Sequence, residues 1–112
     1  MSTTMRNEMS RSGLQATVRE GAEIELRGEI DGRAEAVLQH AYAEAAAPDP
    51  RRILLDFTEV GYINSTGIAL IVGLLTRARQ ERREVVARGL SPHYREIFEI
   101  TRLAEFKTIL PA

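Results

Sequence analysis

The chain has 112 residues, enough for one compact domain, and its 44% hydrophobic and 28% charged residues are the balance of an ordinary globular protein. A net charge of -1 provides no basic field for nucleic acid or anionic lipid, so we expect neither direct nucleic-acid binding nor membrane association. The absence of cysteine excludes disulfides and cysteine-metal clusters, and the longest apolar run is far shorter than the roughly 20 residues of a membrane span.

The first twelve residues are polar, follow no periodic pattern and include the charged residues Arg6, Glu8 and Arg11. A signal peptide needs an apolar core that this segment lacks. We therefore expect residues 1–12 to form a flexible leader, residues 13–112 to form one domain, and the protein to be cytoplasmic.

Apolar and polar residues alternate over 14–18 and again over 22–26, which is the period of a β-strand. The turn at Glu20-Gly21 predicts that the two strands form an antiparallel pair. Residues 28–32 are expected to end the second strand. Asp31 is the expected N-cap of a helix over 33–46, because its carboxylate can accept from unpaired backbone N–H groups. The prolines at positions 48 and 50 end that helix.

A continuous apolar run from Ile53 predicts a strand that is buried on both faces. We expect a loop over 58–65, a helix over 66–83, a strand at 85–87, a helix over 92–101 and a last strand or turn at 106–110. This alternation predicts an α/β fold in which helices pack on a mixed central sheet of about four to five strands. The sheet is expected to be antiparallel at its start and parallel afterwards.

Asn64, Ser65 and Thr66 stand between the predicted buried strand and the predicted helix. Helix N-termini stabilise phosphate, so Ser65 or Thr66 can accept a phosphoryl group without loss of the fold. The same residues are also the commonest helix caps, and a plain cap is the alternative that the sequence leaves open. Gly67 removes a side chain where a partner is expected to approach closely.

The predicted helix that follows is apolar on more sides than one buried stripe requires. We expect the excess to form a partner-binding surface beside the hydroxyl groups, with a fully covered helix as the alternative. The candidate partner-binding residues come from this helix and the two flanking loops: Asp31, Asn64, Ser65, Thr66, Gly67, Ile68, Ile71, Val72 and Leu75.

No catalytic or metal-binding pattern stands out in the sequence. His40 and His93 are far apart and have no carboxylate-histidine spacing, and the Gly61-to-Gly67 spacing lacks the lysine of a phosphate loop. We therefore expect no enzyme activity, no metal and no cofactor. The arginines of residues 77–88 alternate with glutamates, which favours a solvated salt-bridge face over a phosphate-binding site.

Three ordered blocks resemble the STAS family, named for sulfate transporters and anti-sigma factor antagonists. The first is Gly28-Glu29-Ile30-Asp31, the second runs over 53–67 and ends in Asn64-Ser65-Thr66-Gly67, and the third runs over 89–103. Asn64 stands where the family usually has aspartate, and Arg102 stands where it usually has glycine. The resemblance covers nearly everything after the leader and implies a STAS domain over 13–112.

The resemblance further implies an anti-sigma factor antagonist. In such proteins an anti-sigma factor serine/threonine kinase, with a histidine-kinase-like ATPase fold, phosphorylates the first hydroxyl residue of the motif. That residue is Ser65 here, with Thr66 as the fallback, and a phosphatase is a possible further partner. The unphosphorylated protein binds the kinase and frees the sigma factor. The alternative, which the neutral Asn64 keeps open, is a non-phosphorylated STAS subunit of another complex, such as an ABC lipid transporter.

Overall fold

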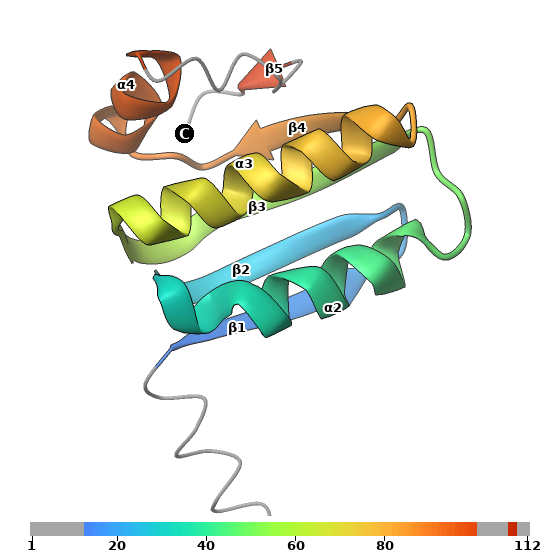
Figure 1. Ribbon diagram of the computed structural model, residues 1–112, viewed down its shortest axis with the longest axis horizontal. Helices are drawn as coiled ribbons and strands as arrows, with labels where there is room; N and C mark the ends of the chain where they lie inside the picture. Colours follow the sequence, from blue (N-terminus) through green and yellow to red (C-terminus); the bar gives the residue numbers. More distant parts are fainter. Residues whose placement is uncertain (1–12, 101–107, 110–112) are drawn as a thin grey trace, which may run out of the picture.

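The computed structural model of the protein describes residues 13–100 and 108–109. The leader expected at 1–12 and most of the strand or turn expected at 106–110 lie outside the described residues. The elements follow in this order: β1 (Leu14–Arg19), β2 (Glu23–Ile30), the 3-10 turn η1 (Gly32–Ala34), α2 (Glu35–Ala46), β3 (Arg52–Ile63), α3 (Ser65–Gln80), β4 (Glu84–Arg88), α4 (Pro92–Ile100) and β5 (Thr108–Ile109) (Figure 1).

The described strands form one five-stranded sheet in the order β1-β2-β3-β4-β5. β1 is antiparallel to β2, whereas the pairs β2–β3, β3–β4 and β4–β5 are parallel. Figure 1 shows α2 in front of β1 and β2, with α3 beside it in front of β3. The predicted α/β domain with a mixed sheet is therefore confirmed.

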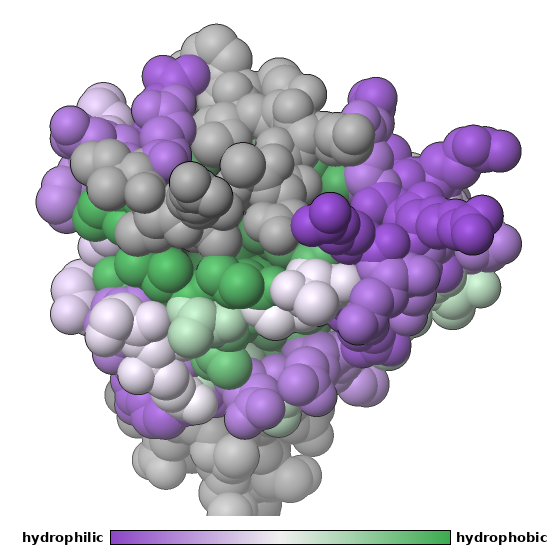
Figure 2. Space-filling view, turned by 45° about the horizontal axis from the view of Figure 1, so that its top comes forward, coloured by the Kyte–Doolittle hydropathy of each residue, from purple (hydrophilic) through white to green (hydrophobic). Residues whose placement is uncertain are grey.

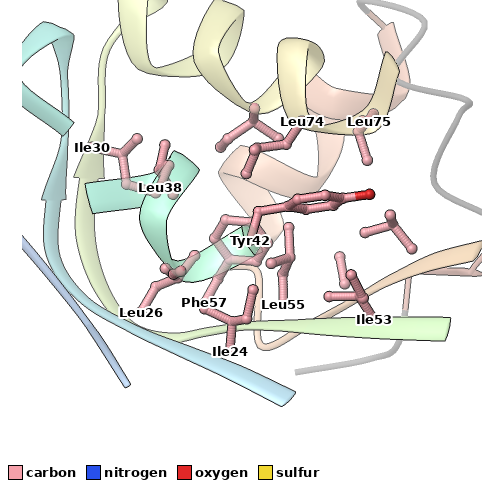
Figure 3. Packing of buried hydrophobic residues seen from close by; sticks show 14 of the residues in the cluster. Ile24, Leu26, Ile30, Leu38, Tyr42, Ile53, Leu55, Phe57, Leu74 and Leu75 are labelled. Atoms are coloured by element: carbon pink, nitrogen blue, oxygen red, sulfur yellow. The ribbon is translucent and has the colours of Figure 1, made fainter. Parts of the chain in front are cut away.

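The core lies between the sheet and the two helices α2 and α3. Strand alternation turns one set of side chains toward the helices, and Figure 3 shows Tyr42 of α2 between Leu55 of β3 and the α3 residues Leu74 and Leu75. Burial of such side chains is the main stabilising contribution to the fold. The core residues with the lowest exposure include Tyr42, Phe57, Phe98, Ile24, Leu26, Ile30, Ile53, Leu55, Ile71 and Leu75.

β3 is longer than the sequence predicted, and the expectation of a loop over 58–65 is wrong, because the strand continues to Ile63. Its register with β2 shifts twice, and each shift leaves one extra residue on β3, first near Thr58 and then at Gly61. Such β-bulges bend a strand and interrupt its alternation. The interrupted alternation explains why this polar stretch has the pattern of a loop.

The helix starts are set by side-chain caps. Asn64 is extended and its Oδ1 accepts a hydrogen bond of 2.8 Å from the backbone N–H of Gly67, so α3 begins at Ser65. Asp31 caps as predicted, but it caps η1, by accepting from the N–H of Arg33 at 2.9 Å. The expected break at 28–32 comes late, since β2 runs on to Ile30.

Two glycines of α3 stand in opposite surroundings. A Cβ atom on Gly67 would overlap the carbonyl group of Ile30, whereas a Cβ atom on Gly73 would meet no atom within 4 Å. Packing of the first turn of α3 on the end of β2 therefore requires glycine at 67. No contact of the described fold requires it at 73.

Alanine substitutions at these two positions are expected to change stability in opposite directions. Gly67→Ala forces α3 away from Ile30 and should lower the free energy of unfolding by about 1–3 kcal/mol. Gly73→Ala improves helix propensity in open space and should raise it by up to about 1 kcal/mol. Urea denaturation measures both, and equal stability of the two variants would contradict the packing described here.

Candidate functional site

The carboxyl ends of β2 and β3 lie side by side, because the strands are parallel and Ile30 is opposite Ile63. The backbone N–H of Asn64 donates to the carbonyl oxygen of Ile30 at 3.1 Å. Gly67 packs on the same carbonyl group. The sequence-predicted residue Asp31 follows directly on Ile30, so the structure brings it together with Asn64 and Gly67.

Gly32 and Thr66 make the contact between the two loops. A Cβ atom on Gly32 would lie 3.4 Å from the Cγ2 methyl group of Thr66, so the η1 turn and the first turn of α3 touch. The η1 turn and the N-terminus of α3 therefore form one continuous surface, which we call the switch surface: residues 31–33 and 64–66.

Ser65 and Thr66 are both exposed on this surface. Asn64 supplies the cap of α3, and within residues 13–100 and 108–109 the structure records no hydrogen bond from either hydroxyl group. Of the three residues that the sequence offered as the cap, Asn64 is the one that provides it. Both hydroxyl groups are accessible to a visiting enzyme.

Three residues expected to contact a partner belong to the core of this chain. Ile71 is 0% exposed and Leu75 is 2% exposed, and Gly67 is buried against Ile30. Within this chain, the side chains of Ile71 and Leu75 and the backbone of Gly67 are covered by its own core, so their expected contact with a partner stays a prediction. Ile68 is half-buried and Val72 is exposed, so these two stay accessible.

The charges of the switch surface are paired. The guanidinium group of Arg33 donates to the carboxylate of Asp31, with 2.8 Å between Nη2 and Oδ2, and Glu29 lies 3.8 Å from the same Nη2. The hydrogen bonds from Arg33 lower the pKa of the Asp31 carboxyl group, which therefore stays ionised. Asn64 adds a neutral amide where the family motif usually has a charge.

Sequence reasoning missed two tyrosines beside this surface. Tyr62 is 50% exposed at the end of β3, and the hydroxyl oxygen of Tyr94 accepts a hydrogen bond of 2.9 Å from the N–H of Ile63. Tyr94 thereby attaches the first turn of α4 to the strand end that leads into Asn64. Tyr62 stands two positions before the helix cap, and this spacing could have placed it beside the site. Nothing in the sequence predicts the position of Tyr94.

Asp56 is buried and holds the first bulge of β3. One carboxylate oxygen accepts from the N–H and the hydroxyl group of Thr58, at 2.9 and 2.6 Å, and the other accepts from Arg88 at 2.9 Å. Burial raises the pKa of the Asp56 carboxyl group, but the hydrogen bonds from Thr58 and Arg88 outweigh it and the net pKa is lowered. Gly89 has a φ of +81° and its Cβ position is occupied by Thr58, so only glycine fits there.

The arginine-rich end of α3 lies far from the switch surface. Arg77 and Arg83 both donate to Glu81, and the hydroxyl group of Tyr42 donates to the same carboxylate at 2.8 Å. The salt-bridge interpretation of these arginines is confirmed for Arg77 and Arg83, and for Arg88, which pairs with Asp56.

The described part of the chain has neither a candidate metal cluster nor a candidate membrane span. No group of three or more His, Asp or Glu residues there is placed to hold a metal ion. None of the helices described is both long and apolar enough to span a bilayer.

Comparison with known proteins gives consistent matches. Residues 14–111 match the family model described as "Mlab, STAS domain". An anti-sigma-B factor antagonist of Listeria monocytogenes is 34% identical over 83 residues, which cover 74% of this chain and 73% of the relative.

Two solved structures have the same fold. An anti-sigma factor antagonist from Mycobacterium paratuberculosis superimposes with a TM-score of 0.67 and 23% identity, covering 86% of this chain and 85% of that one. The Bacillus cell fate determinant SpoIIAA, in its phosphorylated form, superimposes with a TM-score of 0.64 and 19% identity, covering 88% and 90%.

Asp56→Asn is expected to lower the free energy of unfolding at neutral pH by about 1–3 kcal/mol, because an amide cannot accept from both Thr58 and Arg88. The lowered pKa of the native carboxyl group means that its contribution is present above the unfolded-state pKa of about 3.9 and is lost as pH falls through the folded-state value. The variant should therefore lose less stability on acidification than the wild type.

Denaturant titration between neutral and acidic pH measures this difference. Asp49→Asn is the matched control: the Asp49 side chain is 88% exposed, so its ion pair with Arg83 is screened by water and loss of the charge should change stability little. If the free energy of unfolding of Asp56→Asn falls as steeply with decreasing pH as that of the wild type, Asp56 does not hold the bulge.

Proposed function

The chain belongs to the STAS domain family, and from this membership we propose that it is an anti-sigma factor antagonist. In its unphosphorylated form it binds an anti-sigma factor and so makes a sigma factor available. Phosphorylation of Ser65 reverses the binding. The observation that supports this proposal best is the exposed Ser65 hydroxyl group at the start of α3, next to a cap that Asn64 already provides.

The phosphoryl transfer needs only an acceptor from this chain. A bond forms between the Oγ atom of Ser65 and the γ-phosphorus of ATP, the bond from that phosphorus to the bridging oxygen of ADP breaks, and the hydroxyl proton leaves to a base of the kinase. The chain therefore needs no catalytic residue of its own. We propose that its role is regulatory and that it works in the cytoplasm with its partner.

A phosphate on Ser65 is compatible with the helix and incompatible with docking. The partial positive charge of the α3 N-terminus stabilises the phosphate oxygens, so the backbone can stay in place. The roughly two added negative charges stand on the switch surface, where the positive charge of Arg33 is already paired with Asp31 and Glu29. A partner that fits the neutral hydroxyl group then meets repulsion and an uncompensated desolvation cost.

Ser65 is a better acceptor than Thr66. The methyl group of Thr66 faces Gly32, which limits the rotation of that side chain, whereas a serine has no methyl group to place. Thr66 remains the fallback acceptor.

The partner is proposed to be an anti-sigma factor with serine/threonine kinase activity, and a phosphatase would return the chain to its binding form. The Listeria relative is named as an antagonist of an anti-sigma factor, which supports this partner class. That name also favours this function over the alternative of a non-phosphorylated subunit in an ABC lipid transporter.

Radiolabelled ATP and the cognate anti-sigma kinase test the acceptor. The wild-type chain should take up one phosphate, Ser65→Ala should take up none, and the neighbouring control Thr66→Ala should be labelled like the wild type. Mass spectrometry of the labelled peptide identifies the modified residue. Full labelling of Ser65→Ala would contradict the assignment of Ser65, and loss of label in Thr66→Ala alone would move it to the fallback residue.

A further inference from the structure

A groove of about 180 Å³ runs between α2 and α3. Its apolar lining comes from Leu38 of α2 and from one wall on α3, which consists of Ala69, Leu70, Gly73 and Leu74. Figure 2 shows apolar surface gathered across the middle of the molecule, where α3 runs, with hydrophilic side chains to its right and below it. Small-molecule sites are usually larger, about 300–1,000 Å³, whereas an apolar cavity of about 150 Å³ accepts one benzene ring. The groove therefore has the size of a socket for one side chain.

Gly73 gives a separate reason to expect an occupant. Glycine is among the poorest helix formers, and Gly73 lies in the interior of the 16-residue helix α3. Its Cβ position is open, in contrast to Gly67, where the fold itself requires glycine. Ala69, one turn before it, is also small and exposed. A partner can therefore approach the α3 backbone closely along this wall.

The charge at the rim of the groove limits the chemistry of the occupant. Glu35 lies at one end of the groove. Among the described residues, the recorded contact of its carboxylate is a hydrogen bond of 3.4 Å from the uncharged side chain of Gln39. Arg77 lies at the other end and is already paired with Glu81 and placed 4.5 Å over the ring of Tyr42. The unused charge of the rim is therefore negative, and it fits a basic residue.

The groove is continuous with the switch surface. Ala69 is one helical turn from Ser65 and Gly73 is two turns away, about 6 and 12 Å along the helix axis. A kinase must contact the Ser65 hydroxyl group to phosphorylate it. A kinase domain is much wider than these distances, so one that contacts Ser65 also covers the groove.

We propose that the α2–α3 groove is the anchor site for the anti-sigma factor: it receives one medium-sized apolar side chain of the partner, and a basic residue beside that side chain pairs with Glu35. The identity of the partner rests on the function proposed above. The groove supplies affinity, and Ser65 supplies the control, so the two can be changed separately by mutation.

Isothermal titration of the purified cognate anti-sigma kinase with variants of the full chain tests the anchor. Gly73→Phe fills the groove and should weaken binding roughly tenfold or more, because an apolar anchor in a central pocket carries much of an interface's affinity. Thr76→Phe is the matched control, since Thr76 is exposed on α3 and does not line the groove. Thermal unfolding confirms that each variant is folded.

A second pair of variants tests the charge and does not depend on filling the groove. Glu35→Lys should weaken binding, whereas Glu44→Lys, an exposed position of α2 away from the groove, should leave it unchanged. Wild-type affinity in folded Gly73→Phe and Glu35→Lys would overturn the anchor.

Ser65→Asp separates the two proposals. If it abolishes binding while the groove variants bind normally, the anchor is wrong and the phosphorylation switch stands. If the groove variants lose binding and Ser65→Asp does not, the anchor stands and the switch is wrong. If the wild-type chain does not bind the kinase, both are wrong.

Discussion

The close approach of α3 to the end of β2 positions the rest of the site. Gly67 packs on the carbonyl group of Ile30, and the N–H of Asn64 donates to the same oxygen. A side chain at position 67 would separate the two elements and displace Ser65 from the turn at Asp31. Because the helix start is held at the backbone level, a group added to Ser65 changes the charge of the surface without needing a change of fold.

Different residues of one short motif carry different tasks. Asn64 caps the helix, Gly67 permits its packing, and Ser65 is left exposed with no structural role. Two residues outside the motif stabilise this arrangement. Asp56 holds the first bulge of β3, and Tyr94 attaches α4 to the end of that strand. The site is thus built by structural residues around the accessible hydroxyl groups of Ser65 and Thr66, an arrangement compatible with the proposed modification.

Much of the fold was predictable because alternation in the first two strands and the buried run from Ile53 are local signals. The first bulge of β3 was not, since it is held by the Asp56 carboxylate, and the hydrogen bond from Arg88 to that carboxylate joins residues 32 positions apart and forms only in the folded protein. The motif identified the position of Ser65, but periodicity could not show which apolar residues of α3 face outward. Packing of α2 and the sheet buries Ile71 and Leu75 and leaves a groove beside Ala69 and Gly73.

The most direct test asks whether phosphate changes the charge of the switch surface and leaves the backbone in place. It compares how tightly one partner binds two forms of the same chain. The affinity of the anti-sigma kinase is measured for the unmodified chain and for the chain carrying phosphate on Ser65, with backbone NMR shifts of both forms. Phosphorylation should weaken binding by roughly tenfold or more, about 1.4 kcal/mol, with shift changes confined to the switch surface. Equal affinity of the two forms, or rearrangement of the sheet on phosphorylation, would contradict the account.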